Sequence, residues 1–233
     1  MRGAGLVRGW RHRRRCRRLA RACRQDILTG YIAACARLHA DAFDNTPMIA
    51  ADLELTGLDP RRDEIVAIGW TLLDRGRIAL GSNRQLLINA DASVGRSATI
   101  HELLDSELAA GLPPQAGLEA LFRAAKGRCW IFHHAALDVA FLQRACRAWA
   151  GVAPPFVLLD TLQIELTRRR RRELPVKNGD LQLGRLRSQY HLPQYRSHGA
   201  LTDAVATAEL LQAIVSRLDT EKSLPIGRYL KIL

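Results

Sequence analysis

Two carboxylates stand one residue apart in a short apolar segment, Met-Ile-Ala-Ala-Asp-Leu-Glu-Leu, at residues 48–55. The segment is typical of a buried β-strand, in which alternate side chains project from one face, so Asp52 and Glu54 lie side by side. Two buried carboxylates repel each other unless a cation joins them. A hard divalent ion such as Mg²⁺ or Mn²⁺, which prefers oxygen ligands, would resolve this conflict. The alternative is an edge strand with a solvated acidic face, against which the neighbouring Leu53 and Leu55 argue.

Two further acidic residues lie where predicted helices begin. Asp138 follows a predicted strand at 129–132, and Asp203 opens a predicted helix at 202–217, with His198 on the loop before it. Taken singly, each is explained by an ordinary helix cap or a surface histidine. Together, four carboxylates can hold two metal ions, and a histidine that titrates near neutrality can serve as general base for an attacking water. The set favours hydrolysis of a phosphodiester.

These residues need a sheet and helices to bring them together. Three segments that read as strands come first and predict an antiparallel meander: 48–55, 64–73 and 78–88. Helices and short strands then alternate: helices near 99–109, 114–126, 137–149, 160–172, 179–189 and 202–217, and strands at 129–132 and 156–159. This order indicates an α/β fold with a mixed sheet covered by helices, in which sites gather at strand ends and helix N-termini.

Composition narrows the class of protein. The 233 residues, 48% apolar and 25% charged, are typical of a globular chain of one domain or one domain with an appendage, and the apolar runs are too short for a membrane span. The formal net charge is +12, but residues 1–24 hold ten arginines and no acidic residue, and without them the balance falls to +2. A second basic run covers 168–172. Such patches usually meet phosphates, and their charge favours nucleic acid over a membrane surface or a merely solvated arm.

Cysteine usage bears on the compartment. The five cysteines form no CxxC pair, which argues against a disulfide framework or a zinc site and favours a reducing compartment. No apolar segment of the secretory type follows the basic start, so we expect a cytoplasmic protein. The Arg-rich start also resembles a mitochondrial presequence, which is kept as the second option.

Three segments carry a family resemblance. Residues 51–69 (ADLELTGLDPRRDEIVAIG) resemble the first motif of the DEDDh 3′–5′ exonucleases, a family that includes the proofreading (epsilon) subunit of bacterial DNA polymerase III. Residues 132–142 (FHHAALDVAFL) resemble the second motif and 198–211 (HGALTDAVATAELL) the third. The Asp-Thr pair in 158–163 (LLDTLQ) also matches the family, and the resemblance extends over about 47–217.

The resemblance implies an RNase H-like exonuclease fold, with a mixed five-stranded sheet flanked by helices, and two Mg²⁺ or Mn²⁺ ions in each active site. It implies these roles: metal ligands Asp52, Glu54, Asp138 and Asp203; general base His198; contacts to the terminal nucleotide from Leu55, Thr56, Ile100 and His101. Two positions depart from the motifs, because His134 replaces the usual asparagine and Glu102 a common glycine. We assign His134 to the substrate site as a second polar contact.

The predicted organisation is a basic helical arm (1–45), an exonuclease domain (46–218) and a C-terminal tail (219–233). The predicted activity is metal-dependent 3′–5′ hydrolysis of single-stranded or frayed DNA ends to nucleoside 5′-monophosphates, in proofreading or repair. An exoribonuclease for RNA or short oligoribonucleotides is the first alternative. A non-catalytic nucleic-acid-binding accessory module is the second. The partners expected are DNA, with RNA and a DNA polymerase subunit as further options, and no membrane.

Overall fold

The computed structural model describes residues 3–38, 42–89, 110–195, 199–218 and 225–233. Its sheet has six strands in the order β3-β2-β1-β4-β5-β6. The strands are β1 (Met48–Leu55), β2 (Ile65–Asp74), β3 (Arg77–Leu87), β4 (Cys129–Phe132), β5 (Val157–Asp160) and β6 (Lys231–Ile232). The first three strands form the predicted antiparallel meander, and β1, β4 and β5 run parallel.

The sheet is mixed, as predicted, but it has one strand more than expected. β6 comes from the C-terminal tail and pairs antiparallel with β5, joining Val157 to Ile232 and Leu158 to Lys231. Two residues are too few to show the alternation of apolar and polar side chains by which a strand is recognised in a sequence. The prediction of five strands was therefore wrong by this short edge strand.

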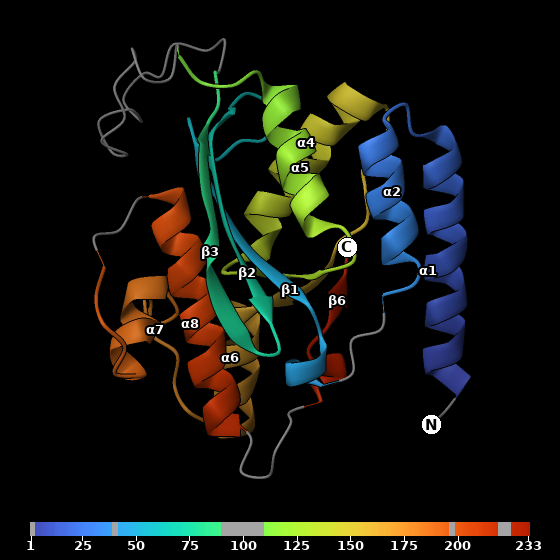
Figure 1. Ribbon diagram of the computed structural model, residues 1–233. Helices are drawn as coiled ribbons and strands as arrows, with labels where there is room; N and C mark the ends of the chain where they lie inside the picture. The colour runs from blue at the N-terminus through green and yellow to red at the C-terminus, as the bar shows by residue number, and fades with distance from the viewer. Residues whose placement is uncertain (1–2, 39–41, 90–109, 196–198, 219–224) are drawn as a thin grey trace.

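Helices cover both faces of the sheet (Figure 1). They are α1 (Gly3–Ala22), α2 (Asp26–Cys35), α4 (Pro114–Ala125), α5 (Ala135–Ala150), α6 (Thr161–Arg171), α7 (Leu183–Gln189) and α8 (Ala200–Leu218), with short 3₁₀ turns at Phe43–Asn45 and Ile226–Arg228. α7 is shorter than the predicted 179–189. The helix expected near 99–109 lies outside the described residues. Among the residues described, no helix combines the length and apolar character that crossing a membrane requires.

The two faces of the sheet have separate apolar cores. One core joins α1, α2, α4 and α5 to the odd-numbered side chains of β1, such as Ile49 and Leu53. The other joins α6, α7 and α8 to the even-numbered side chains Met48 and Ala50. Because strand side chains alternate, Asp52 and Glu54 follow Met48 and Ala50 onto the face that α8 covers.

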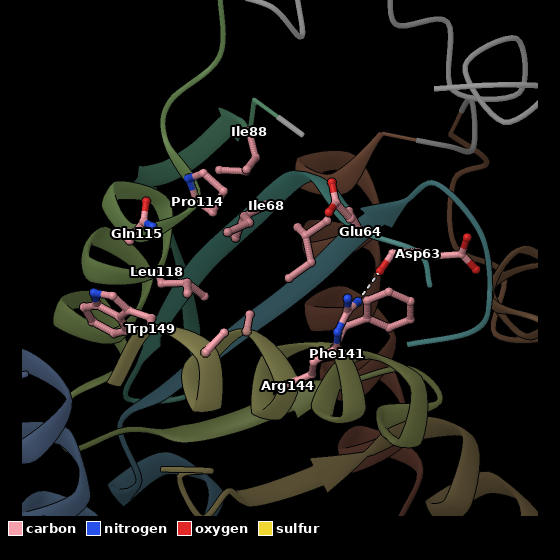
Figure 2. A pocket seen from close by; sticks show the side chains of 13 residues that line it. Asp63, Glu64, Ile68, Ile88, Pro114, Gln115, Leu118, Phe141, Arg144 and Trp149 are labelled. Atoms are coloured by element: carbon pink, nitrogen blue, oxygen red, sulfur yellow. Dashed lines mark hydrogen bonds between the residues drawn. The ribbon is translucent and has the colours of Figure 1, made fainter. Parts of the chain in front are cut away.

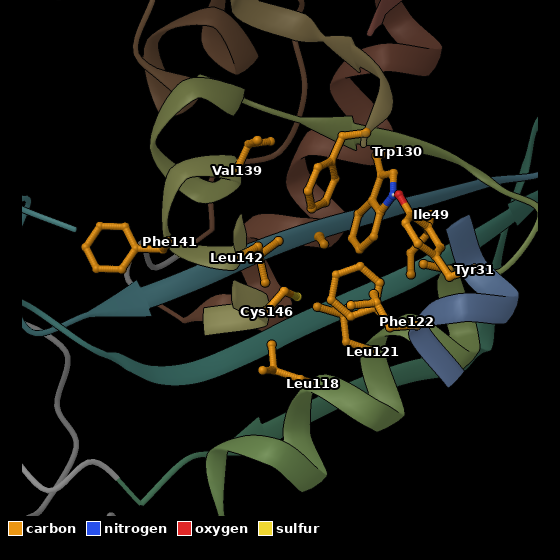
Figure 3. Close-up of a cluster of buried hydrophobic side chains, with 14 of the residues drawn as sticks. Tyr31, Ile49, Leu118, Leu121, Phe122, Trp130, Val139, Phe141, Leu142 and Cys146 are labelled. Carbon is orange, nitrogen blue, oxygen red and sulfur yellow. The ribbon is translucent and has the colours of Figure 1, made fainter. Parts of the chain in front are cut away.

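The first core includes α2, which lies inside the predicted arm. Figure 3 shows Tyr31 beside Phe122 and Trp130, with Tyr31 fully buried. The Tyr31 hydroxyl donates to the Pro155 carbonyl at 2.8 Å and accepts a hydrogen bond from Trp130 Nε1 at 2.8 Å. α2 thus shares the core of the sheet, while the division into arm, domain and tail stays a prediction.

Candidate active site

β1 is a central strand between β2 and β4, and its carboxyl end carries the first two carboxylates. Glu54 is buried and Asp52 is partly buried. The pairing of β1 with β2 shifts register between Glu54 and Leu55, so the regular ladder is interrupted directly after the two acidic residues.

A glycine on the neighbouring strand allows α8 to approach these carboxylates. Gly69 of β2 is the pairing partner of Asp52. A Cβ atom at Gly69 would lie 2.1 Å from the carbonyl carbon of Ala200 and 2.2 Å from the amide nitrogen of Leu201. The backbone at the start of α8 therefore packs directly on β2, which brings Asp203, in the first turn of α8, to the end of β1.

The approach creates a three-carboxylate cluster. One oxygen from each of Asp52, Glu54 and Asp203 lies within 4.8 Å of the other two. Burial, and then repulsion from Asp138, Asp203 and Glu54, raises the pKa of Asp52 well above its usual value. Burial, and then repulsion from Asp203, raises the pKa of Glu54 to about 7. Such a concentration of negative charge costs free energy unless a cation offsets it, and three carboxylates suit Mg²⁺ or Mn²⁺, so the residues present fit the predicted metal.

Asp138 borders this cluster from the other core. It lies in the first turn of α5 and is buried. Burial raises its pKa to about 7, although backbone hydrogen bonds from its own amide and from Leu53 lower it. The charges of Asp160 and Glu54 raise it further. Asp138 therefore belongs to the same acidic site as Asp52 and Glu54, although it is not one of the three residues whose oxygens lie closest together.

The junction of β4 and α5 separates the two adjacent histidines. The ring of His133 bonds Thr161 Oγ1 at 2.8 Å through Nδ1 and the Leu181 carbonyl at 2.9 Å through Nε2. Since a carbonyl only accepts, Nε2 carries the proton and Nδ1 accepts from the Thr161 hydroxyl. Burial lowers the pKa of His133 to about 4, so the ring is neutral and structural.

His134 is exposed, in contrast, and turns the chain into α5. Its φ of 69° lies in the left-handed region, which a non-glycine residue adopts at a cost. Its amide donates to Asp160 Oδ1 at 3.2 Å, and the same oxygen caps α6 by accepting from the Gln163 amide at 3.3 Å. Asp160 thus holds the turn at His134, and this turn leads into the helix that carries Asp138.

Leu55 and Thr56 follow the acidic pair. Leu55 is buried. Thr56 bonds Glu64 twice: its amide donates to the Glu64 carbonyl at 3.0 Å, and its hydroxyl accepts from the Glu64 amide at 2.9 Å. This pairing closes the loop between β1 and β2 and fixes the backbone next to Glu54.

A hollow opens beside this loop. Its volume is about 280 Å³, and side chains from β2, α4 and α5 line it (Figure 2). Phe141 and Trp149 of α5 supply aromatic surface, and Arg144 Nη1 donates to the Asp63 carbonyl at 2.6 Å. Glu64, the partner of Thr56, lies at the rim. The hollow lies on the face of the sheet that carries the first core, and its lining includes none of the four carboxylates.

A buried arginine secures the chain just before α8. Arg187 of α7 donates from Nη1 to the Ala206 carbonyl at 2.8 Å and from Nη2 to the Pro193 carbonyl at 2.7 Å. It also forms an ion pair with Glu209 at 2.8 Å, and its guanidinium lies 4.5 Å from the centre of the Tyr195 ring. The segment at 193–195 is thus fastened to α8. The predicted residues His198, Ile100 and His101 lie outside the described residues.

Sequence reasoning missed Gly69 and gave Asp160 no role in the site. A glycine inside a predicted strand often marks a close backbone approach, and that signal was present in 64–73. In the sequence, Asp160 stood out only as part of the Asp-Thr pair that matches the family. Asp52, Glu54 and Asp203 lie together and Asp138 borders them, while the assignment of the four carboxylates as metal ligands stays a prediction.

Comparison with known proteins decides the family. The family model described as exonuclease of the RNase T type matches residues 49–211, which is most of the chain. The chain belongs to the RNase T exonuclease family. This is the DEDD exonuclease family that its three motifs predicted, and the predicted RNase H-like fold is confirmed.

The chain is also similar to curated proteins and to solved structures. The PolC-type DNA polymerase III of Thermotoga petrophila is 25% identical over 178 residues, and that of Caldanaerobacter subterraneus subsp. tengcongensis is 27% identical over 171. These matches cover 76% and 73% of this chain but only 12% of each relative. Among solved structures, the cell-death related nuclease CRN-4 has a TM-score of 0.64 at 12% identity, covering 75% of this chain and 65% of that one. E. coli exonuclease I bound to a dT13 oligonucleotide has a TM-score of 0.60 at 15% identity, covering 74% and 41%.

Proposed function

We propose that this exonuclease is metal-dependent and removes nucleotides from single-stranded or frayed 3′ ends of DNA, releasing nucleoside 5′-monophosphates. The observation that carries the proposal is the cluster of Asp52, Glu54 and Asp203 beside buried Asp138. A protein that only binds nucleic acid gains nothing from a concentration of negative charge facing phosphates, so the non-catalytic alternative is disfavoured.

In this proposal Asp52, Glu54, Asp138 and Asp203 hold two Mg²⁺ or Mn²⁺ ions. When bound, such ions lower the pKa of water and neutralise the charge that develops at the scissile phosphate. His198 takes the proton of the attacking water, as general base. Leu55 and Thr56, with Ile100 and His101, position the terminal nucleotide.

His134 supplies an additional polar contact to the strand. Its exposed ring stands at the turn that Asp160 holds, next to the helix that carries Asp138. A histidine replaces the amide that the family motif usually has there, and it keeps a ring nitrogen able to donate to a phosphate oxygen.

The choice of DNA rests on the relatives. Two are DNA polymerases of the PolC type, and exonuclease I has been crystallised with a deoxyribonucleotide oligomer. Because both of these relatives are polymerases, cooperation with a polymerase subunit in proofreading or repair is part of the proposal. Hydrolysis of RNA is the alternative, and the experiment must distinguish it from hydrolysis of DNA.

The test uses 5′-labelled single-stranded DNA and RNA of equal sequence, with Mn²⁺ or with EDTA. We expect a ladder that shortens from the 3′ end of the DNA, that EDTA abolishes and that is weaker on RNA. Asp203→Asn should lower the rate about 100- to 1000-fold, because it removes a ligand of the ions that stabilise the charge developing at the phosphate.

A matched control is Asp74→Asn, which removes an exposed carboxylate at the far end of β2 that pairs with Arg128. Mn²⁺ should raise the melting temperature of wild type and of this control but not of Asp203→Asn. Strand binding without cleavage by wild type in Mn²⁺ would contradict the proposal, and faster cleavage of RNA would change the substrate class.

A further inference from the structure

α1 is fixed to the body of the protein along one face. Cys16 is completely buried, and Leu19, Ala20 and Cys23 pack against the first core. The ring of His12 donates through Nε2 to the Cys35 carbonyl of α2 at 3.1 Å. These contacts hold α1 against α2, so the basic segment forms a rigid surface in its described part.

The opposite face of α1 carries positive charge and one aromatic ring. Trp10, Arg14, Arg17, Arg18 and Arg21 recur at helical spacing on this face, and all five are exposed. We call these five residues the arginine stripe. The Arg14 guanidinium lies 5.3 Å from the centre of the Trp10 ring, which is itself 59% exposed.

No opposite charge offsets the stripe within its own helix. Residues 1–25 contain no acidic residue, and three further exposed arginines, Arg11, Arg13 and Arg15, flank the stripe. Like charges on adjacent helical turns are unfavourable, so a bound polyanion would relieve their repulsion. Arginine also matches phosphate geometry with two donors at once, and an exposed aromatic ring can stack on a base.

A membrane is the less suitable partner. A helix that lies on a membrane buries its apolar face among the lipids. The apolar face of α1 is already packed on α2 and the first core, so among the side chains described from residue 9 onward, charge and Trp10 remain to meet a surface.

We infer that the arginine stripe binds the internal phosphates of the nucleic-acid strand whose 3′ end occupies the acidic site. This inference rests on the proposed function. α1 lies on the opposite side of the molecule from α8 (Figure 1), so the stripe meets nucleotides far upstream of the cleaved bond. The stripe thus favours long strands, while the acidic site acts on any 3′ end.

The test compares two triple variants that each remove three charges. One is Arg14→Gln with Arg17→Gln and Arg21→Gln in the stripe. The control is Arg123→Gln with Arg147→Gln and Arg185→Gln, which are exposed residues of α4, α5 and α7 outside both basic runs. Glutamine keeps helix propensity, so circular dichroism and melting temperature should match wild type for both.

Binding is measured by fluorescence anisotropy in EDTA, where no cleavage occurs, with a labelled single strand of about 40 nucleotides at several salt concentrations. The stripe variant should bind roughly ten-fold or more weakly at about 0.1 M salt, and its logarithmic salt slope should fall by about 2, as expected for three lost phosphate contacts on a single strand. The control should change both quantities much less.

Binding to vesicles rich in phosphatidylserine is measured in parallel. Three results would overturn the inference: no loss of strand affinity in the stripe variant, an equal loss in both variants, or a loss of vesicle binding without a loss of strand binding. A separate assay of wild type on an oligomer of about five nucleotides with Mn²⁺ tests the proposed nuclease activity itself. If wild type cleaves the short oligomer but the stripe variant binds the long strand as wild type does, the role of the arginine stripe is refuted and the proposed nuclease activity is not.

Discussion

His133 and His134 are neighbours in the sequence, yet the structure gives them different chemistry. His133 is held neutral inside the protein by Thr161 and Leu181, whereas His134 faces solvent. The residue type alone would assign both to the site. The hydrogen bonds show that His133 supports the turn and that only His134 is available to a ligand.

The partly buried, hydrogen-bonded ring of His133 predicts a pH dependence of stability. Burial lowers its pKa from the ordinary value of 6.5 to about 4, so protonation opposes folding. The contribution of neutral His133 is complete above about pH 6.5 and is lost as the pH falls toward 4. By pH 5 the loss is about 2 kcal/mol, since each pH unit costs about 1.4 kcal/mol.

The measurement is the free energy of unfolding by urea at pH 7.5 and at pH 5 for wild type and His133→Asn. The variant should start less stable at pH 7.5 and lose about 2 kcal/mol less on acidification. An equal loss in both proteins would show that His133 is not the titrating group.

At the scale of elements, the site depends on how closely α8 approaches β2. Gly69 permits this contact, because any larger residue would meet the backbone of Ala200 and Leu201. A methyl group cannot be accommodated by rotating a side chain there, since the atoms it meets belong to the main chain. The helix itself must move, and Asp203 moves with it.

We therefore expect Gly69→Ala to lower the rate of hydrolysis about 100-fold or more, the scale of misplacing a catalytic group by about 1 Å. Stability should fall by about 1–3 kcal/mol from overpacking. Gly81→Ala in β3 is the control, because a Cβ there meets nothing within 4 Å. Rates and Mn²⁺ affinity are compared by strand cleavage and calorimetry, and an unchanged Mn²⁺ affinity in Gly69→Ala would refute the argument.

The second basic run, residues 168–172, contains both paired and exposed arginines. Arg168 and Arg169 both pair with Glu165, which is fully buried and also accepts a hydrogen bond from the Tyr190 hydroxyl at 2.8 Å. Arg170–Arg172 remain exposed. Arg169 also bonds Asp180 and Gln189 and so links α6 to the chain around α7, whereas Arg168 pairs within α6. Five consecutive identical residues could not reveal this difference in the sequence.

Over the whole molecule, the features that could be predicted from the sequence are those that depend on a local pattern of residues. The order of strands and helices around the carboxylates follows from periodicity, and four acidic side chains were placed at strand ends and helix starts. The sequence did not predict the two-residue β6, or the docking of α1, whose apolar face consists of few and small residues scattered among arginines. The close approach at Gly69 was also missed, because it arises between segments far apart in the chain.

The last prediction concerns whether residues 1–45 behave as an arm or as part of the core. Tyr31 contacts Phe122 edge-on, with ring centres 4.9 Å apart, and its hydroxyl links Trp130 to Pro155. Tyr31→Ala removes this ring and leaves the buried Trp130 N–H without its partner, so it should cost about 3–5 kcal/mol. Tyr31→Phe keeps the ring and should cost about 1–2 kcal/mol.

Urea unfolding followed by circular dichroism, and by fluorescence of the buried tryptophans, distinguishes the two cases. If α2 belongs to the core, Tyr31→Ala shifts one cooperative transition that both probes report, since a shared core unfolds as a unit. If the segment were an independent arm, the tryptophan transition would stay where it is in wild type. The hydrogen bonds from Tyr31 to both β4 and the chain before β5 lead us to expect the first result, in which the basic helix α1 is carried on an integral part of the exonuclease fold.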